Sequence, residues 1–296
     1  MRITWLPDVE RRERHVAVGE FDGVHLGHRE VIRGADTVLT FEPHPRQVVA
    51  PDAAPKLLTS LDTKTDLIAG LGVRELVVIP FDRSFAAQGP QEFIDDVLVG
   101  QLGATKVSVG ENFRFGHKAK GDAELLRAQT AFEPRVVPLV EVDGEIVSST
   151  HIRGLVVAGD LEQANRFLGM PFQLRGPVMH GDERGRTLGF PTANLVPDNA
   201  LVYPSNGVYA CRAAVEEGGE WRWWPAAVNV GVRPTFKTGR GVLVEAYLLD
   251  YEGDLYDREL RLAFLNRLRG ERRFDTVEAL VEQMHRDVED ARALAA

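Results

Sequence analysis

One cysteine, Cys211, occurs among the 296 residues of this chain. A single thiol cannot form a disulfide within one molecule, which suits a reducing compartment. No apolar run reaches the roughly 18 residues that a membrane-spanning helix needs, and the start of the chain lacks an apolar segment typical of a signal peptide. We therefore expect a cytoplasmic protein without a membrane partner.

Positive charge is scarce as well. There are 35 Lys and Arg residues against 44 Asp and Glu residues, which gives a formal net charge of −9. Proteins that bind nucleic acids normally carry a basic surface, so we expect no nucleic-acid partner. The Walker A pattern, G-x-x-x-x-G-K-[ST], is absent, which excludes a P-loop kinase. Neither composition nor motif indicates an oligomeric state.

The pattern of elements changes near residue 170, and the length favours two domains. Before that point, short apolar runs alternate with helical stretches, among them 62–71 and 90–102. This alternation predicts an α/β domain with a parallel, Rossmann-like sheet, whose ligands bind at the carboxyl ends of the strands. The expected strands are 16–18, 38–41, 76–79, 107–109 and 136–140.

The second half is rich in strands and predicts a closed or nearly closed antiparallel β-barrel. Gly218 and Gly219 fit a hairpin turn between two of these strands. A helix follows the barrel, with Asp275 as its N-cap and Glu278 three residues later. The expected strands are 172–178, 207–215, 221–230, 242–251 and 255–265. The apolar stripe expected to pack the helix on the barrel is Val277, Leu280, Val281, Met284 and Val288.

The segment GEFDGVHLGH at 19–28 is the most distinctive motif of the chain. It lies between a predicted strand and a predicted helix, where free N–H groups and a partial positive charge attract anions. Gly23 and Gly27 allow the backbone to approach a ligand closely. His25 and His28 share one side of the first helical turn, and each can donate to a phosphate oxygen. The alternative is that both histidines are surface or capping residues.

A second motif, SSTHIR at 148–153, follows an apolar run and precedes another predicted helix. Hydroxyl groups at a helix start can cap the helix or hold phosphate. Arg153 adds a planar fork of donors at the same place. On its own, the hexapeptide is equally typical of an ordinary N-cap.

The second half contains a third motif, GRTLGFPTAN at 185–194. Thr192 and Asn194 place two small oxygen ligands on one side of an extended segment, a set that suits Mg²⁺ together with nucleotide phosphates. A plain glycine-proline loop is the alternative. Glu245 stands among apolar residues, where an unpaired carboxylate would be costly to bury, unless it points outward from a half-exposed strand.

Together these motifs resemble those of bacterial bifunctional riboflavin kinase/FAD synthetases, which are also FMN adenylyltransferases. The resemblance extends along nearly the whole chain. It includes the segments TFEPHP at 40–45, VGENFRFG at 109–116, YPSNGVY at 203–209, NVGVRPTF at 229–236, VEAYLLD at 244–250 and FLNRLRGERRF at 264–274.

The resemblance implies an FMN adenylyltransferase domain over 1–170 and a riboflavin kinase domain over 171–296. Riboflavin would be phosphorylated to FMN by ATP with Mg²⁺, and FMN would be adenylylated by ATP to FAD with release of pyrophosphate. The residues implied in catalysis are Glu245, as general base, and His25, His28 and Arg153. Those implied in ATP or phosphate binding are Gly19, Phe21, Gly23, Gly27, Ser148, Ser149, Thr150, Gly185, Gly189, Pro191, Thr192 and Asn194. Those implied in flavin binding are Asn112, Phe113, Arg114, Asn229, Arg269 and Glu271, and Thr192 and Asn194 would also bind the metal.

The chain departs from the family's usual pattern in its first half. Residues 20–36, 17 in all, form the first crossover; at least about 10–12 are needed, so the helix carrying His28 can have only about two turns. Glu20 adds a negative charge beside a polyanion site, and His151 replaces a residue that is commonly cationic. Two alternatives stay open: a monofunctional riboflavin kinase with a degenerate adenylyltransferase domain, and a non-catalytic flavin- or nucleotide-binding protein.

Overall fold

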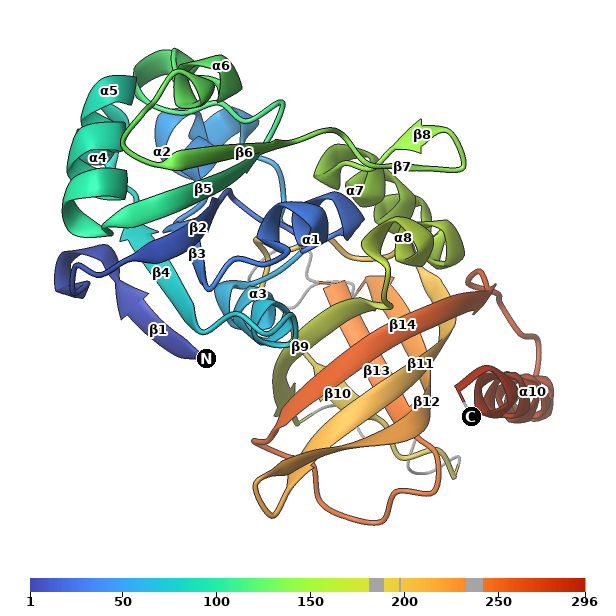
Figure 1. Cartoon of the computed structure of the whole chain (residues 1–296). Helices are drawn as coiled ribbons and strands as arrows, with labels where there is room; N and C mark the ends of the chain where they lie inside the picture. Colours follow the sequence, from blue (N-terminus) through green and yellow to red (C-terminus); the bar gives the residue numbers. More distant parts are fainter. Residues whose placement is uncertain (181–188, 197, 233–241, 296) are drawn as a thin grey trace. The chain divides into compact units, whose positions relative to one another are not determined.

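The first unit of the molecule is built on a parallel sheet. A computed structural model describes residues 1–180, 189–196, 198–232 and 242–295, and the chain forms two compact units, Met1–Ser149 and Thr150–Ala296 (Figure 1). The six strands of the first unit lie in the order β1-β4-β3-β2-β5-β6, and every neighbouring pair is parallel. They are β1 (Arg2–Trp5), β2 (Arg14–Val18), β3 (Thr37–Glu42), β4 (Glu75–Pro80), β5 (Ala104–Gly110) and β6 (Glu133–Val137). The expected parallel sheet is confirmed.

Short helices connect these strands. They are α1 (Leu26–Ile32), α2 (Pro45–Val49), α3 (Leu61–Ala69), α4 (Arg83–Ala86), α5 (Pro90–Glu92) and α6 (Ala123–Arg127), with 3₁₀ turns at Leu6–Asp8, Pro51–Ala53 and His117–Ala119. A two-stranded ribbon, β7 (Glu141–Val142) and β8 (Glu145–Ile146), ends the unit. The helix expected over 90–102 is α5 followed by a π-helical segment, Phe93–Gln101, in which Leu102 N donates to Val97 O at 2.9 Å.

The strand order places a topological switch between β2 and β5. From β2 the chain builds β3 and β4 on one side, and it then returns to build β5 and β6 on the other. In open α/β sheets, ligands bind at such a point, outside the carboxyl ends of the strands. The turn after β2 and the loop after β5 are the segments that contain GEFDGVHLGH and VGENFRFG. The fold therefore brings two of the predicted motifs to one edge of the sheet.

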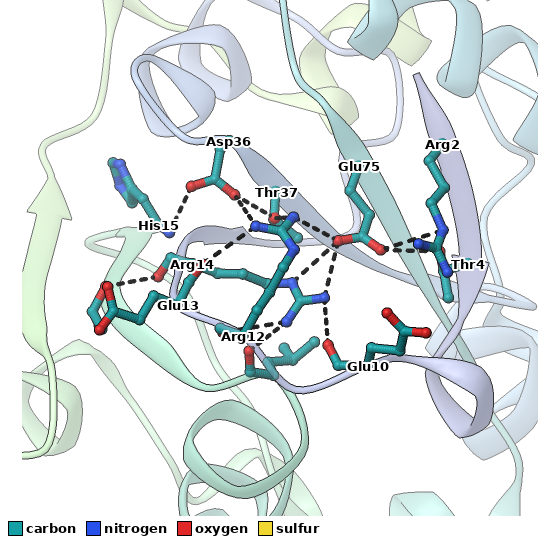
Figure 2. Close-up of polar contacts among 12 residues, drawn as sticks. Arg2, Thr4, Glu10, Arg12, Glu13, Arg14, His15, Asp36, Thr37 and Glu75 are labelled. Atoms are coloured by element: carbon teal, nitrogen blue, oxygen red, sulfur yellow. Dashed lines mark hydrogen bonds and ion pairs between the residues drawn. The ribbon is translucent and has the colours of Figure 1, made fainter.

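Buried, oppositely charged side chains join the strands at the opposite edge of the sheet, where the parallel strands begin. Glu75 begins β4, and its carboxylate accepts from Arg14 Nε at 3.1 Å, Arg12 Nη2 at 2.8 Å and Thr4 Oγ1 at 3.0 Å (Figure 2). Arg14 begins β2, and its Nη1 also donates to Leu102 O at 2.6 Å. Because both charges of the Arg14–Glu75 pair are buried and hydrogen-bonded, this cluster fixes the strand ends away from the ligand edge.

The second unit is a closed antiparallel barrel with the strand order β10-β13-β12-β11-β14-β9, which confirms the expected architecture. Its strands are β9 (Phe172–Met179), β10 (Ala193–Leu195), β11 (Gly207–Glu217), β12 (Glu220–Val232), β13 (Val242–Leu248) and β14 (Glu259–Arg269). Its helices are α7 (Ser149–Ala158), α8 (Leu161–Leu168) and α10 (Val277–Ala295). Gly218 and Gly219, with φ of 62° and 87°, form the predicted hairpin turn between β11 and β12.

Several expected bounds were wrong at strand ends. The strand expected over 136–140 ends at Val137, because Pro138 has no N–H to donate to the ladder. The strand expected over 242–251 ends at Leu248, and Asp250 follows with a φ of 61° that a strand does not allow. The strand expected over 255–265 begins at Glu259. Sequence analysis missed β1 and β10, whose four and three residues are too short for a periodic pattern.

The start of α10 also differs from the expectation. Thr276 is its cap, because Thr276 Oγ1 accepts from Ala279 N at 3.2 Å, so the prediction of Asp275 was wrong by one residue. Val277 is exposed, and the residues that α10 buries are Asp287, Ala291 and Ala295. The small alanine side chains let this helix approach β11 and β12 closely.

The α7–α8 pair packs on the barrel. Asn165 Nδ2 donates to the backbone oxygens of Phe264 and Leu265 at 2.8 and 3.2 Å, while Asn165 Oδ1 accepts from Phe172 N at 2.7 Å. Gly159 turns between the two helices with φ +82°, and a Cβ there would collide with Ser205 Oγ. Within the described ranges, no helix has both the length and the apolar character needed to cross a membrane.

Candidate functional site

The turn after β2 carries the paired histidines. His25 is the N-cap of α1, and its Nδ1 accepts from His28 N at 3.2 Å. The two rings are stacked with centroids 3.5 Å apart and planes 16° apart. Because Nδ1 of His25 is an acceptor, the ring carries a proton on Nε2, which can act as a hydrogen-bond donor. The seven-residue α1 has two turns, as the short crossover predicts.

Backbone shape in this turn depends on small or strained residues. Phe21 and Gly23 have φ of 51° and 89°, in the left-handed region. The Phe21 ring is buried edge-on against His28, 5.4 Å between centroids. A Cβ at Gly19 would lie 3.0 Å from the Phe21 ring, and one at Gly27 would lie 3.3 Å from the His25 ring. These four predicted residues therefore shape the turn around the histidines.

Asp22 ties this turn to the start of α3, a role that sequence analysis missed. Its buried Oδ1 accepts from Leu58 N at 2.8 Å and from Thr59 N at 3.1 Å. Thr59 Oγ1 in turn accepts from Gly23 N at 3.1 Å. Ser149 Oγ donates to the backbone oxygen of Asp22 at 2.9 Å. In the sequence, the signal for this role was an acidic residue between buried neighbours. A buried carboxylate needs hydrogen-bond donors such as these two backbone N–H groups.

His28 is held in its neutral form. Burial lowers the pKa of His28 well below its ordinary value, and the neighbouring charges of His25 and Lys64 lower it further. Within the described residues, His28 Nδ1 is buried and has no hydrogen-bond partner. Lys64 itself is buried in α3, where burial lowers its pKa and Asp22 is the largest of three acidic influences that raise it. Neutral imidazoles bind phosphate as hydrogen-bond donors.

Glu20, which departs from the family pattern, has a defined partner. Its Oε2 lies 2.7 Å from His44 Nε2. His44 Nδ1 accepts from Arg46 N at 3.2 Å, so the ring proton is on Nε2 and faces the carboxylate. Glu20 is about two-fifths exposed while His44 is buried. The added charge of Glu20 is therefore directed to His44.

The loop after β5 carries three of the six residues predicted to contact flavin, Asn112, Phe113 and Arg114. Phe113 is half-buried and stacks on Phe115, with centroids 5.5 Å apart, at the edge of the apolar core. Asn112 and Arg114 are exposed, and Arg114 Nη1 lies 3.4 Å from Asp122 Oδ2. Phe113 thus packs against the core and stays partly exposed.

The SSTHIR motif spans the start of α7. Ser148 precedes the helix and Ser149 begins it. Arg153 Nη1 lies 3.5 Å from Thr150 Oγ1, one helical turn away. The His151 ring contacts Phe167, with centroids 4.8 Å apart. Hydroxyls and guanidinium thus share one end of α7, as the motif predicts.

Three polar residues lie side by side on the barrel wall. Glu245 of β13 is opposite Asn194 of β10 and Asn229 of β12 in the strand register. Its neighbours Val244 and Ala246 are fully buried in the barrel interior, so the three polar side chains face outward. Asn229 Nδ2 donates to Glu245 Oε2 at 3.2 Å. Glu245 therefore does alternate outward, but it is half-buried between two amides.

The residues predicted to bind metal meet this row. Asn194 is buried, and in the part of the chain described its Oδ1 has no hydrogen-bond partner. A buried oxygen without a hydrogen-bond partner is expected to bind a ligand, and an amide oxygen suits Mg²⁺, a hard cation that prefers oxygen ligands. Thr192 is half-buried and Pro191 exposed, and Gly189 has φ +87°. The prediction for Gly185 lies outside the described residues.

Arg269 and Glu271 contact protein partners near the end of β14. Arg269 donates from Nε and Nη2 to the buried Asp287 of α10 at 2.9 and 2.7 Å. Glu271 Oε2 accepts from Asn206 Nδ2 at 3.3 Å, and Glu271 Oε1 would lie 3.2 Å from a Cβ at Gly231. Their roles toward flavin stay predictions.

Comparisons with known proteins match both halves of the chain. The family model described as riboflavin kinase matches residues 168–295, and that described as FAD synthetase matches residues 8–151. A "Bifunctional riboflavin kinase/FMN adenylyltransferase" of Pseudomonas fluorescens is 38% identical, with 97% of this chain and 94% of that protein covered. A protein of the same name from Bacillus subtilis is 37% identical, with 95% and 92% covered. A solved structure from Streptococcus pneumoniae, titled as a macrolide-efflux protein, has a TM-score of 0.87 and 30% identity over 99% of both chains.

Proposed function

We propose that this chain, which belongs to the bifunctional riboflavin kinase/FMN adenylyltransferase family, carries out the two reactions of that family in its two separate halves. The chain phosphorylates riboflavin to FMN and adenylylates FMN to FAD, with ATP as the donor in both steps. Residues 171–296 perform the first reaction and residues 1–170 the second. The observation that carries this division is that each half holds its own polar site within the range of one family model.

Glu245 is the general base of the kinase reaction. Its carboxylate takes the proton of the terminal ribityl hydroxyl of riboflavin as that oxygen attacks the γ-phosphorus of ATP. The bond from this phosphorus to the bridging oxygen breaks, and ADP leaves with the electron pair. A base fixed on a rigid strand between two amides is well placed for this, since phosphoryl transfer depends mainly on positioning.

His25 and His28 serve the adenylyltransferase reaction. A phosphate oxygen of FMN attacks the α-phosphorus of ATP, and the bond to the pyrophosphate oxygen breaks. The stacked imidazoles donate hydrogen bonds to the phosphates, His28 in its neutral form, and the N–H groups at the start of α1 add to the same field. No covalent enzyme intermediate is required. The family resemblance also implies phosphate-binding roles in this reaction for Ser148, Thr150 and Arg153 of the SSTHIR motif.

Thr192 and Asn194 would hold Mg²⁺ in the kinase site, where the ion supplies neutralisation of phosphate charge. The unpartnered, buried Oδ1 of Asn194 supports this assignment. Within the described residues, no group of three or more His, Cys, Asp and Glu side chains forms a metal site. The nucleotide phosphates would therefore complete the coordination. The buried, single Cys211 is consistent with a cytoplasmic location.

A pair of single substitutions in the full-length protein tests this division. Glu245→Gln removes the proton acceptor and keeps the size of the side chain, so FMN formation should fall by about 10²–10⁴. His28→Ala removes one pre-organised donor, so conversion of FMN to FAD should fall by about 10²–10³. Both rates are measured by separating riboflavin, FMN and FAD after incubation with Mg-ATP.

Each variant is the control for the other. Glu245→Gln should convert supplied FMN to FAD at the parent rate, and His28→Ala should make FMN from riboflavin at the parent rate. A kinase rate within a few-fold of the parent in Glu245→Gln would remove the base assignment. A parent protein that makes FMN but never FAD would instead identify a riboflavin kinase with a degenerate first half.

A further inference from the structure

The hydrogen bond between Asn229 and Glu245 has a consequence for the kinase reaction. The two residues are directly opposite each other in the antiparallel β12–β13 register, so their side chains share one face of the barrel wall. The amide Nδ2 of Asn229 contacts Oε2 of the carboxylate at 3.2 Å. Among the described residues, the Glu245 side chain makes this one hydrogen bond. One carboxylate oxygen is thus held, and Oε1 is left for a ligand.

A glycine and a second carboxylate lie near the Asn229 amide or its strand. Gly231 lies two residues beyond Asn229 on the same face of β12, and a Cβ there would lie 3.8 Å from Asn229 Nδ2 and 3.2 Å from Glu271 Oε1. The contact with the amide would be ordinary, so the absent side chain mainly leaves room for the Glu271 carboxylate. Glu271 is in turn held by Asn206 Nδ2 at 3.3 Å. The carboxylate that the Asn229 amide holds is therefore that of Glu245, while Glu271 has a partner of its own.

We infer that Asn229 is a positioning residue for the Glu245 base: it holds Oε2, and Oε1 is the oxygen that receives the proton from the ribityl hydroxyl. This inference rests on the proposed role of Glu245. A glutamate side chain has three rotatable bonds, and only a fraction of its rotamers direct Oε1 at one point. A donor fixed on the neighbouring strand selects those rotamers.

The inference differs from the flavin-binding role that the family resemblance implies for Asn229. A residue that binds riboflavin changes the KM for riboflavin whatever stands at position 245. A residue that acts through the base changes kcat, and its effect disappears when the base is gone. The two roles are therefore separated by a double-mutant cycle.

The experiment compares Asn229→Ala, Glu245→Gln and the double variant in the full-length protein. Loss of a hydrogen bond to a charged group predicts that Asn229→Ala lowers kcat for FMN formation by about 10- to 100-fold. The KM for riboflavin should stay within about threefold, and the double variant should be no slower than Glu245→Gln. Asn229→Asp puts a like charge beside Glu245, so the acidic limb of its kcat–pH profile should move to higher pH. Glu271 is a second ionisable group, placed beside Gly231 of the same strand, so the pH profile is also measured in Glu271→Gln to separate its contribution.

Controls separate positioning from folding and from failure of the base assignment. Gln173→Ala removes a comparable outward-facing amide on β9 and should leave kcat unchanged. Asn229→Ser, a smaller change, should show the same kcat effect if Asn229→Ala unfolds. The inference is overturned if Asn229→Ala and Asn229→Ser keep the parent kcat while Glu245→Gln is inactive, or if the losses in the double variant multiply. An active Glu245→Gln would overturn the base assignment itself, and this inference with it.

Discussion

At the scale of single residues, the histidine pair shows how burial selects a protonation state. A surface imidazole has a pKa near neutrality, whereas the His28 ring is stacked on His25 with its Nδ1 buried. A cationic pair at this distance would be self-repelling. Phosphate binding by a neutral donor avoids that repulsion, and it leaves positive charge to Lys64.

The lowered pKa of His28 predicts a pH dependence of stability. In the unfolded chain this histidine takes up a proton near pH 6.5, whereas in the folded chain it stays neutral to lower pH. Below that pH the unfolded state binds the extra proton, so the free energy of unfolding of the first unit should fall as the pH drops from 7 to 5. His28→Gln cannot titrate and should lose less stability over the same range.

The measurement is urea unfolding at pH 7 and pH 5, followed through amide hydrogen exchange in β2 and β3. Both proteins contain the same other titratable groups, so the difference between their pH dependences isolates residue 28. An equal loss of stability in the two proteins would mean that His28 is protonated in the folded state.

At the scale of elements, the Glu75 cluster predicts a large effect from a small change. Burial raises the pKa of Glu75, but hydrogen bonds from Arg12, Thr4 and Arg14 outweigh it and hold the pKa below its ordinary value. Glu75→Gln would leave the buried Arg14 without its counter-ion, so we expect a loss of about 3–5 kcal/mol of unfolding free energy. Denaturant unfolding at pH 7 measures this loss.

An exposed ion pair of the same sheet provides the comparison. Glu133 pairs with Lys106 between β6 and β5, in contact with water, so Glu133→Gln should leave the stability unchanged. The contribution of Glu75 should also disappear in acid. A carboxylate whose folded-state pKa is lowered stabilises the fold fully above its unfolded-state pKa, and this contribution is lost as the pH falls through the folded-state pKa. Equal stability of parent and Glu75→Gln at pH 7 would contradict this account.

Sequence periodicity predicted most of the elements but not their ends. The apolar runs of β2 to β5 and the glycine pair of the β11–β12 hairpin carry local signals that tertiary packing reinforces. β10 has three residues, and its pairing with β9 and β13 depends on partners distant in the sequence. The cap of α10 was misplaced because Asp275 and Thr276 are both good caps, and only the backbone geometry distinguishes them.

The candidate sites were predictable as motifs and not as contacts. GEFDGVHLGH indicated the histidines and glycines, yet the bond from Asp22 to Leu58 and Thr59 joins residues 36 and 37 positions apart. The pairing of Glu20 with His44 likewise depends on the adjacency of the turns after β2 and β3. Such contacts follow from the strand order, which no local pattern specifies.

At the scale of the whole molecule, the α7–α8 pair predicts how the chain can be cut. A fragment of residues 150–296 keeps the hydrogen bonds of Asn165 to Phe172, Phe264 and Leu265. We expect it to fold and to make FMN but no FAD. A fragment of residues 172–296 loses these bonds and exposes the surface that Phe167 and Leu168 cover, so its melting temperature should be lower.

Calorimetry and product analysis of the two fragments measure this difference. Equal melting temperatures would show that α7 and α8 contribute nothing to the barrel, in favour of a boundary at residue 170. Production of FAD by either fragment would contradict the assignment of that reaction to the first half.

The boundary between the two units falls inside the SSTHIR motif, between Ser149 and Thr150. A gene truncation during evolution that removed the adenylyltransferase half could not remove the whole motif. The barrel needs α7 and α8 for its own packing, and α7 contains part of the motif. Thr150 and Arg153 would survive as a relic in a kinase that makes no FAD. Selection on the barrel's stability therefore also acts on part of the other enzyme's signature.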